Sequence, residues 1–411
     1  MIRGVALLGI VIENVRFFAM PISRAVKGPW TLDGGVADST VAYLDLVFGH
    51  YKFLGLFTLL FGFGLATQQA RLAASGAASR PFQLRRIGWL AAAGLLHGLG
   101  LFFGDVLFVF AGIALLSLPL LGRSTRVRLG LGLGLVVFSA ILAARGPLQS
   151  WLDQPATVAP AMTSVAETGP PNIEAESNDP LRDEAAMTPV TEGFESRFRN
   201  WRSSISYGVS FYGWYLLGLV LIGTALRDLG FFSEEHAGRR NQIAFPCLAA
   251  GLFLELAGFL PPHLRGGDGF APVAWAFLHP IAAAMVTIGY AGLITTLVEK
   301  GRFPIAGTFA ILGRMSLSGY LLESILLAVV FRSWGLGWYD TLGNAAAVGV
   351  GIAVFGLVMA AGLLWNRWFL LGPFEWCWRW FTYLQRPPIR RPDARADGRF
   401  VDLTSRRSTD D

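Results

Sequence analysis

Charged residues and cysteines are both scarce in this sequence. Only 15% of its 411 residues are Asp, Glu, Lys or Arg, against roughly a quarter in an ordinary soluble domain. The two cysteines, Cys247 and Cys377, are too few for a disulfide framework and lack the spacing of a thiolate metal site. These shortages exclude a soluble globular domain and a disulfide-stabilised scaffold, and we predict no metal.

Hydrophobic residues make up 53% of the chain, and they gather in long runs. Runs of about 20 residues recur, and each is long enough to cross a hydrocarbon core of ~30 Å. An outer-membrane barrel would need short alternating segments instead. We therefore predict an all-α fold, a polytopic integral membrane bundle with about ten transmembrane helices. The predicted spans are residues 3–21, 48–69, 84–103, 105–121, 127–144, 205–226, 243–260, 273–297, 313–331 and 343–366. The first run has no small-residue cleavage site, so we interpret it as a retained span and not a signal peptide.

Basic residues alternate between successive loops. Loops 70–86 and 122–128 are rich in arginine, whereas loop 22–47 is balanced and loop 145–204 is acidic. Cytoplasmic loops carry the excess of Lys and Arg, so the alternation places both termini in the cytoplasm. The net charge of +6 comes from these loops and does not indicate a nucleic-acid partner.

The same pattern gives the domain organisation. We predict a single transmembrane bundle over residues 1–384 and a disordered cytoplasmic tail over 385–411, which is charged and Pro-rich. The extracytoplasmic loop 145–204 is Pro-, Ser- and acid-rich, so we expect little packed structure in it. Whether it is a lid or a spacer is left open.

Several ionisable side chains fall inside the predicted spans. Such groups are costly in hydrocarbon, so they usually face the bundle interior or a wet cavity and mark a functional site. On the predicted topology most of them lie in the central or outer half of the bilayer. The candidates are His97, Asp105 and Glu323, with Glu13, Arg16, Glu255 and His279 as further buried polar residues.

Structural roles remain open for some of these residues. Glu13 and Arg16 share a helix face and can form an ion pair. His279 precedes Pro280 and can satisfy a backbone group freed by a kink there. His50 and Lys52 can lie in the headgroup layer. Glu323 follows Tyr320 by three residues and is harder to explain by structure alone.

His97 and Asp105 suggest general base catalysis. A histidine takes a proton from an attacking hydroxyl or amine, while a carboxylate fixes its tautomer and stabilises the imidazolium. In one continuous helix the two side chains would be ~12 Å apart along the axis. Direct contact therefore requires the helix to break, and Gly104 is the expected place.

Five segments carry a resemblance to a known family. They are "RGVALLGIVIEN" (3–14), "KFLGLFTLLFGFGLATQ" (52–68), "LRRIGWLAAAGLLHGLGLFFGDVLFVFAGI" (84–113), "GRMSLSGYLLES" (313–324) and "LGPFEWCWRWFTY" (371–383). Together they resemble the YeiB-like family of bacterial inner-membrane proteins, annotated mostly as of unknown function, over residues 3 to about 384. Two departures stand out. Relatives usually have a short basic-and-acidic stretch before the Arg-Gly, which leaves the true start of this protein open, and Glu13 replaces an apolar residue of the second motif.

The family in turn resembles the transmembrane acyltransferase superfamily, which includes heparan-alpha-glucosaminide N-acetyltransferase. The resemblance implies an acyl-CoA donor, acetyl-CoA above all, bound from the cytoplasm, and an acceptor on the far side of the membrane. His97 would then be the catalytic histidine and Asp105 its partner. The arginines Arg85, Arg86 and Arg314 would hold the phosphate end of the donor, since a guanidinium fork suits phosphate. They can equally be ordinary positive-inside anchors.

Two functions are therefore weighed. The first is an acyltransferase of the cell envelope that moves an acyl group, with acetyl favoured, to an extracytoplasmic glycan, lipid or small metabolite. The alternative is a proton-coupled transporter or exporter that uses the buried histidines and carboxylates, and a purely structural or signalling protein is the third reading. The segments "GFGLATQ" and "GLGLGL" are not nucleotide-binding loops. The expected location is the bacterial inner membrane, with the lipid bilayer as partner, and a homodimer is left open.

Overall fold

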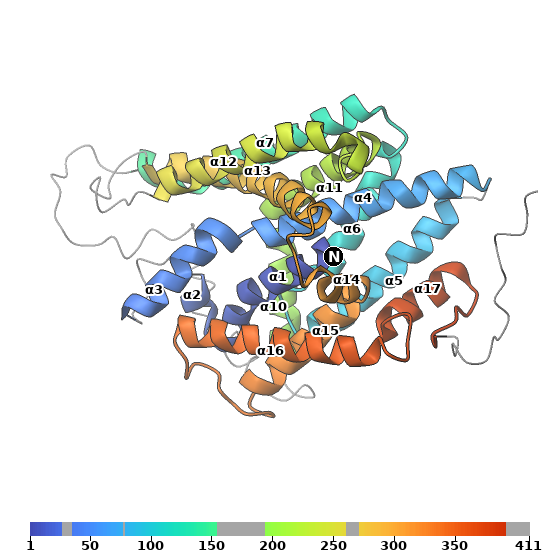
Figure 1. Cartoon of the computed structure of the whole chain (residues 1–411). Coiled ribbons are helices and arrows are strands. Elements are labelled where there is room, and N and C mark those ends of the chain that lie inside the picture. The colour runs from blue at the N-terminus through green and yellow to red at the C-terminus, as the bar shows by residue number, and fades with distance from the viewer. Residues whose placement is uncertain (27–34, 77–78, 154–193, 260–270, 392–411) are drawn as a thin grey trace, which may run out of the picture.

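The structure, a computed structural model, describes residues 1–26, 35–76, 79–153, 194–259 and 271–391 (Figure 1). Within these residues the chain is helical, and the only extended pairing is an isolated bridge between Phe369 and Arg390. The α-helices are α1 (Ile2–Ala19), α2 (Ile22–Ala25), α3 (Gly35–Leu44), α4 (Lys52–Ala74), α5 (Ser79–Gly100), α6 (Leu107–Ser117), α7 (Thr125–Leu152), α10 (Phe194–Tyr207), α11 (Gly213–Asp228), α12 (Ala237–Phe259), α13 (Ala271–Glu299), α14 (Ala306–Arg314), α15 (Ser316–Phe331), α16 (Asn344–Trp365) and α17 (Pro373–Tyr383). Two π-helical segments, η2 (Asp45–Gly49) and η4 (Gly208–Tyr212), and two 3₁₀ turns, η3 (Leu118–Leu120) and η5 (Glu234–His236), complete the set.

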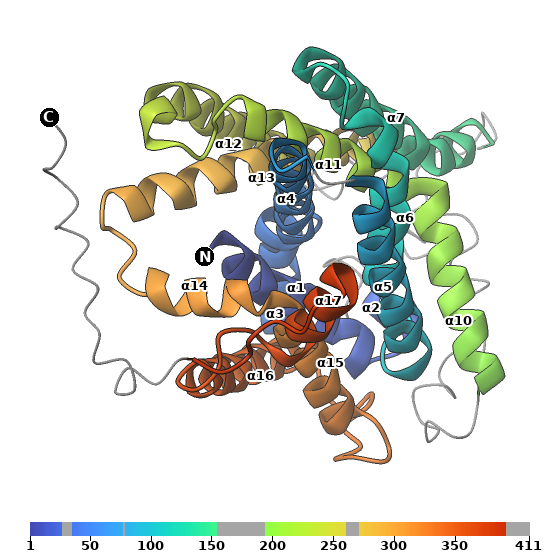
Figure 2. The ribbon, with the colours of Figure 1, turned by 90° about the vertical axis from the view of Figure 1, so that its right-hand side faces the viewer.

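The helices form two groups that meet at α4. The first group is α7, α11, α12 and α13, which pack on one another. The second is α1, α14, α15, α16 and α17 (Figure 1). Helix α4 contacts α11 and α13 of the first group and α1 of the second. Helix α5 packs against α6, α10 and α17, and Figure 2 shows it running beside α6 and α10.

The predicted all-α polytopic membrane bundle is confirmed. In the described part of the chain, six helical segments are long and apolar enough to cross a membrane: Gly35–Ala74, Thr125–Leu152, Arg197–Asp228, Glu234–Gly258, Ala271–Glu299 and Asn344–Trp365. The bent pair α14 and α15 makes up to seven. Of the other predicted spans, α1 and α5 carry three arginine or acidic side chains or more, and α6 has only 11 residues. The total of ten spans and the cytoplasmic termini stay predictions.

Two predicted segments differ from the structure near the ends of spans. The predicted loop 22–47 contains α3, which runs through η2 toward α4. The predicted span 313–331 corresponds to α15, and at its start the chain bends by 87° between α14 and α15 at Met315. A carboxylate caps the start of α15 at this bend: Glu375 of α17 accepts the backbone N–H groups of Leu317 and Ser318 at 2.7 and 3.1 Å. A carboxylate at these first N–H groups satisfies donors that have no partner inside the helix.

Small residues allow the two groups to approach closely. A Cβ atom on Gly62 of α4 would lie 2.1 Å from the carbonyl oxygen of Val220 in α11. A Cβ on Gly223 of α11 would lie 2.0 Å from the carbonyl oxygen of Leu59 in α4. Both distances are shorter than any real contact, so these two helices can cross here only with glycine on each side.

The structure describes both ends of the predicted loop 145–204 and the first residues of the predicted tail 385–411. Helix α7 continues to Leu152 and α10 begins at Phe194, so both ends of loop 145–204 are helical, while residues 154–193 lie outside the described residues. In the tail, the N–H of Leu370 donates to Ile389 and that of Arg391 donates to Trp368. Residues 389 and 391 are therefore hydrogen-bonded to the segment that follows α16, and the predicted disorder of the tail 385–411 stays a prediction. Residues 392–411 lie outside the described residues.

Candidate functional site

His97 and Asp105 contact each other across a break in the helical path. Helix α5 ends at Gly100 and α6 begins at Leu107. The turn between them brings Asp105 back, so that Nδ1 of His97 donates to Oδ1 of Asp105 at 2.8 Å. Both side chains are buried. The helix ends four residues before Gly104, the predicted breaking point, and a Cβ at Gly104 would strike the ring of Phe102 at 2.7 Å.

A second bond fixes the carboxylate of Asp105. Its Oδ2 atom accepts the backbone N–H of Phe108 at 2.8 Å, in the first turn of α6. A Cβ on Gly94 of α5 would lie 2.3 Å from that same Phe108 nitrogen and 2.7 Å from Asp105 Oδ2. Glycine at 94 therefore allows the start of α6 to approach α5. The local sequence builds the pair by ending one helix early and leaving room for the next.

Within the described part of the chain, only Nδ1 of the His97 ring is hydrogen-bonded. Its Nε2 is buried and has no hydrogen-bond partner among the described residues. The ring of Tyr320 from α15 lies 5.0 Å from the imidazole, centroid to centroid. Because Asp105 holds Nδ1–H, the free Nε2 is the atom that can accept a proton.

Glu323 lies on the same helix as Tyr320, and among the described residues it makes no hydrogen bond to His97 or Asp105. It follows Tyr320 by three residues on α15, so the two side chains occupy neighbouring positions on one helix face. The Glu323 side chain is 2% exposed, and its Oε1 atom has no partner among the described residues. From α15, Tyr320 and not Glu323 lies against His97. In the sequence, Tyr320 was noted only because it precedes Glu323 by three residues.

A second histidine–carboxylate pair lies on other helices. Nδ1 of His279 in α13 donates to Oε2 of Glu255 in α12 at 3.0 Å. Lys52, the first residue of α4, places Nζ 2.8 Å from the other oxygen, Oε1 of Glu255. His279 thus binds a carboxylate and not the backbone next to Pro280. Its Nε2, like that of His97, is buried and unpartnered among the described residues.

Lys52, for which the headgroup layer was one open interpretation, belongs to the protein interior. The Lys52 side chain is fully buried, and its Nζ also donates to the carbonyl of Leu46 at 2.6 Å. The cause is local backbone geometry. The π-helical segment η2 ends at Gly49, and Tyr51 then adopts a left-handed conformation with φ 63°. This turn starts α4 with Lys52 facing the protein interior.

Arg16 and Glu13 have different partners from the one the sequence suggests. Arg16 lies 3.9 Å from Asp45 in η2, and the predicted Glu13–Arg16 pair is not among the ion pairs of the described residues. Glu13 lies within electrostatic range of Asp45 and Lys52. Sequence reasoning counted Asp45 as an ordinary acidic residue of the 22–47 loop. Its position at the start of an apolar run was the available signal.

Tyrosines lie between the two histidine–carboxylate pairs. The Tyr51 ring lies 5.6 Å from the His279 ring and 5.8 Å from the Tyr212 ring. Tyr212 ends the second π-helical segment, η4, and lies within electrostatic range of both Glu13 and Asp105. Single-turn π-segments inside helices often mark functional sites. Here η2 and η4 both contribute side chains to one buried polar region.

The predicted donor arginines lie at the opposite end of α5 from His97. Arg86 hydrogen-bonds to Gln68, and its guanidinium lies 4.6 Å from the Trp378 ring of α17. Arg85 donates to the carbonyl of Thr382, also in α17, at 3.0 Å. Eleven residues separate Arg86 from His97, which is about 17 Å along the axis. Arg85 and Arg86 therefore share α17 as a neighbour.

Arg314 is exposed and lies apart from those contacts. It donates to Asn366 of α16 at 3.2 Å. A fourth arginine, Arg3, was missed: it donates to the carbonyl of Leu60 at 3.2 Å and lies within electrostatic range of Arg86. Arg3 and Arg314 both lie near Met1.

The helices and the site define the class: a multi-pass helical membrane protein with two buried histidine–carboxylate pairs and a basic region at one end. Residues 226–385 match the family model described as "Protein of unknown function (DUF418)". The chain is 28% identical over 395 residues to "Uncharacterized protein YeiB" of Escherichia coli (strain K12), covering 93% of this chain and 94% of the relative. These matches confirm the resemblance to the YeiB-like family.

Two further relatives come from other bacteria. "Uncharacterized protein YxaH" of Bacillus subtilis (strain 168) is 25% identical over 401 residues, covering 95% of this chain and 94% of the relative. An "Uncharacterized 39.9 kDa protein in amylase 3'region" of Bacillus acidopullulyticus is 23% identical over 394 residues, covering 94% of each chain. No solved structure matches the chain significantly. The similarity thus extends over nearly the whole length of all three relatives.

Proposed function

We propose that this protein is a membrane-embedded acyltransferase that moves an acyl group, with acetyl the favoured one, from cytoplasmic acyl-CoA to an acceptor at the outer side of the membrane. One observation carries the proposal. His97 is bonded through Nδ1 to Asp105, and its Nε2 is buried without a partner among the described residues. A general base needs this arrangement, in which one nitrogen is fixed and the other is available to the acceptor.

The transfer step balances without any further reactant. Nε2 of His97 takes the proton of an acceptor hydroxyl or neutral amine as the acceptor atom attacks the thioester carbon. The carbon–sulfur bond then breaks, and the thiolate of CoA takes the proton from the imidazolium, which returns His97 to its neutral form. Asp105 stabilises the imidazolium in between. Tyr320, whose ring lies 5.0 Å from the imidazole, is the residue suited to donate a hydrogen bond to the oxygen that becomes negative.

The donor binds from the other end of α5 in this proposal. Arg85 and Arg86, with Arg3 and Arg314, hold the phosphate groups of acyl-CoA, and the pantetheine arm extends toward His97. The separation of ~17 Å between Arg86 and His97 along α5 suits an extended pantetheine arm and is too long for direct contact between the phosphate groups and His97. Glu323 is proposed as a second acid–base group through its unpartnered buried carboxyl oxygen. The bacterial relatives support a location in the inner membrane, with the acceptor in the cell envelope.

The second histidine–carboxylate pair supplies a matched control for the test. Purified protein in lipid nanodiscs is given acetyl-CoA, and the released CoA thiol is measured for wild type, His97→Ala and His279→Ala. We expect wild type to bind acetyl-CoA and to release CoA slowly as the acetyl group passes to water or to an added acceptor. His97→Ala should bind normally and lose release, whereas His279→Ala should keep it. Absence of acetyl-CoA binding by folded wild type would exclude the donor half of the proposal.

A proton-coupled transporter is the second candidate function. The observation that favours it is the Lys52–Glu255–His279 cluster, in which a buried carboxylate bonds to two titratable partners. Ionisable groups inside membranes commonly form proton relays. The two candidates separate in proteoliposomes that contain a pH-sensitive dye. A transporter predicts proton movement that is lost in Glu255→Gln and kept in His97→Ala, and the acyltransferase predicts no such movement.

A further inference from the structure

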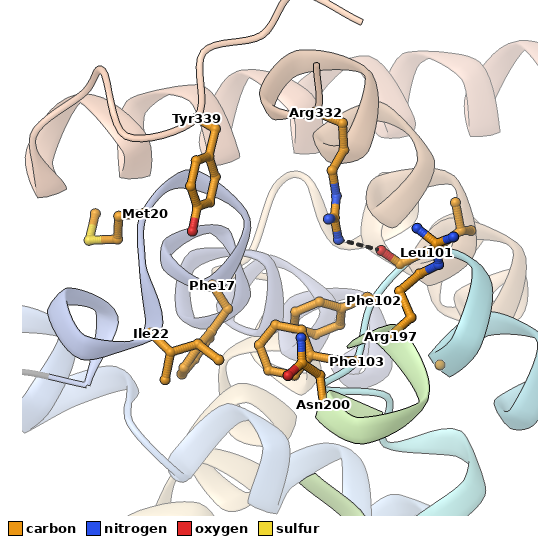
Figure 3. Close-up of a pocket in the computed structure, with 11 residues that line it drawn as sticks. Phe17, Met20, Ile22, Leu101, Phe102, Phe103, Arg197, Asn200, Arg332 and Tyr339 are labelled. Carbon is orange, nitrogen blue, oxygen red and sulfur yellow. Dashed lines mark hydrogen bonds between the residues drawn. The ribbon is translucent and has the colours of Figure 1, made fainter. Parts of the chain in front are cut away.

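The two ends of α5 differ in what they offer to a ligand. After α5 ends, a small cavity follows, which Phe17, Phe102 and Phe103 line together with other residues (Figure 3). Its volume is about 20 Å³, which is room for about one water molecule and not for a larger ligand. At its other end, α5 packs against α17 (Figure 1). The residues around α17 form an exposed basic surface.

The basic surface belongs to residues 366–391, which contain one carboxylate and several exposed arginines. The carboxylate, Glu375, is buried because it caps the start of α15. The exposed charges of this segment are therefore all positive. The arginines that define the basic surface are Arg367, Arg379, Arg386, Arg390 and Arg391.

The fold brings arginines together from both sides of α17. The segment after α17 folds back onto the segment before it, where Phe369 and Arg390 form a bridge. The N–H of Arg391 also donates to the carbonyl of Trp368 at 2.9 Å. These contacts place Arg390 and Arg391 next to the chain around Arg367, so charges that are more than 20 positions apart share one surface.

Large apolar side chains are exposed among these arginines. In α17, Trp380 is 48% exposed and Phe381 50%, and both follow Arg379 directly. Before α17, Trp368 is 57% exposed and follows Arg367. Exposed rings beside cations are typical of the membrane–water interface, where the rings lie at the level of the headgroups and basic residues meet anionic lipids. The basic surface has both parts of this pattern.

Helix α17 links the basic surface to the start of α5. The carbonyl of Thr382 accepts the side chain of Arg85 at 3.0 Å. One residue further, the ring of Tyr383 lies 4.9 Å from that of Phe82 in α5. A ligand that holds α17 in place therefore stabilises the packing of α17 on α5 and raises the stability of the folded protein.

We propose that the basic surface binds anionic lipids, with its arginines at the lipid phosphates and its exposed rings beside the upper parts of the acyl chains. A lipid fits better than a soluble phosphate compound, because apolar side chains are exposed between the charges. Each arginine near a membrane surface adds about a fivefold increase in affinity for anionic lipid. Lipid binding here is independent of the proposed acyl transfer, since it uses neither His97 nor Asp105.

Short-chain lipids test the proposal on the purified full-length protein in maltoside micelles. The unfolding midpoint is followed by intrinsic fluorescence during titration with dioctanoyl phosphatidylglycerol, dioctanoyl phosphatidylcholine or glycerol phosphate. We expect phosphatidylglycerol, which has both net charge and acyl chains, to raise the midpoint saturably, with an apparent affinity at least about tenfold above the other two. Equal effects of the two lipids would overturn the role of charge. An equal effect of glycerol phosphate would overturn the assignment to lipid.

A triple variant assigns the binding to the basic surface. Arg367→Gln, Arg379→Gln and Arg390→Gln together should weaken the apparent affinity for phosphatidylglycerol on the order of 100-fold. The triple with lysine at the same positions should keep most of the affinity, since attraction to the lipid surface depends on charge. Undiminished binding of phosphatidylglycerol by the folded Gln triple would overturn the proposal.

Exposed arginines of other basic loops supply the matched control. The control triple removes the same charge elsewhere and should leave the affinity nearly unchanged; it combines Arg71→Gln, Arg123→Gln and Arg126→Gln. An equal loss in both folded triples would indicate attraction to net charge alone and would overturn the assignment to this surface. Wild type gives a further measurement, because 1 M salt shortens the Debye length to about 3 Å. Selectivity for phosphatidylglycerol should then largely disappear, and full selectivity at that salt would contradict binding through exposed charges.

Discussion

Nζ of Lys52 lies 2.8 Å from Oε1 of Glu255, and both side chains are fully buried. Lys52 begins α4, and Glu255 lies near the end of α12, 203 positions later in the chain. Desolvating both charges is unfavourable, so the pair is tolerated because each charge satisfies the other and His279 bonds to the remaining carboxylate oxygen. The ion pair therefore fixes how α4, α12 and α13 pack.

Removing only the lysine should be strongly destabilising. Lys52→Met leaves the Glu255 carboxylate buried without its cation, and we expect the free energy of unfolding to fall by about 3–5 kcal/mol. Unfolding followed by circular dichroism in mixed micelles measures this value. Lys300→Met, at an exposed lysine, is the control and should change little. The double variant Lys52→Met with Glu255→Gln should recover part of the loss, and no recovery would contradict an electrostatic cause.

The Asp105 carboxylate should be needed for turnover more than for donor binding. Asp105→Asn removes the charge that stabilises the His97 imidazolium and weakens the preference for Nδ1–H. General base catalysis contributes about 100- to 10,000-fold, so we expect acyl transfer to fall by roughly 100-fold or more. CoA release and acetyl-CoA binding are measured on the same samples.

A matched acidic residue tests the specificity of that effect. Asp153→Asn removes an exposed carboxylate at the end of α7 and should leave both quantities unchanged. A folded Asp105→Asn protein with full CoA release would show that His97 does not work through this pair.

Gly94 should tolerate no side chain. A Cβ atom there would lie 2.3 Å from the backbone nitrogen of Phe108, and a backbone group cannot rotate away. We expect Gly94→Val to displace the start of α6, to lower the free energy of unfolding by about 1–3 kcal/mol and to reduce acyl transfer together with it. Gly88→Val on the same helix, where a Cβ meets nothing within 4 Å, is the control. Equal effects at both positions would indicate a general loss of helix packing.

Glu375 should make stability depend on pH. Burial raises the pKa of this α17 carboxyl, and hydrogen bonds from Ser318 and Leu317 oppose that rise. A raised pKa in the folded state means that its stabilising contribution is fully present below the ordinary carboxyl range and is lost as pH rises through the folded-state pKa. The unfolding free energy of wild type, measured relative to that of Glu375→Gln, should therefore fall as pH increases from about 4, the usual carboxyl range, to about 8.

The serine that bonds to this carboxylate gives the companion measurement. The Ser318 hydroxyl donates to Oε2 of Glu375 at 2.5 Å. Ser318→Ala removes a group that lowers the Glu375 pKa, so the stability loss should move to higher pH. A pH profile that is identical in wild type, Ser318→Ala and Glu375→Gln would show that another group is responsible.

Most helices could be predicted from the sequence because a membrane span is set by one local property, the length of an apolar run. The predicted spans 273–297 and 343–366 coincide with α13 and α16 within two residues at each end. The predicted span 313–331 ends with α15 at Phe331, but the bend at Met315 was not predicted, because the carboxylate that caps α15 there comes from Glu375, about 60 residues away. Helix α3 was missed because the 22–47 segment is mixed in polarity.

The sequence by itself determined the class of protein, the position of His97 and Asp105 in an apolar run, and the basic end of α5. These follow from composition and spacing, which act within one helix. Only the tertiary structure decided which charges meet, Lys52 with Glu255 and Arg16 with Asp45, and which ring lies against His97, that of Tyr320. A buried charge is stabilised by whichever opposite group packing brings within about 4 Å, and that distance is set by how helices cross and not by their order in the chain.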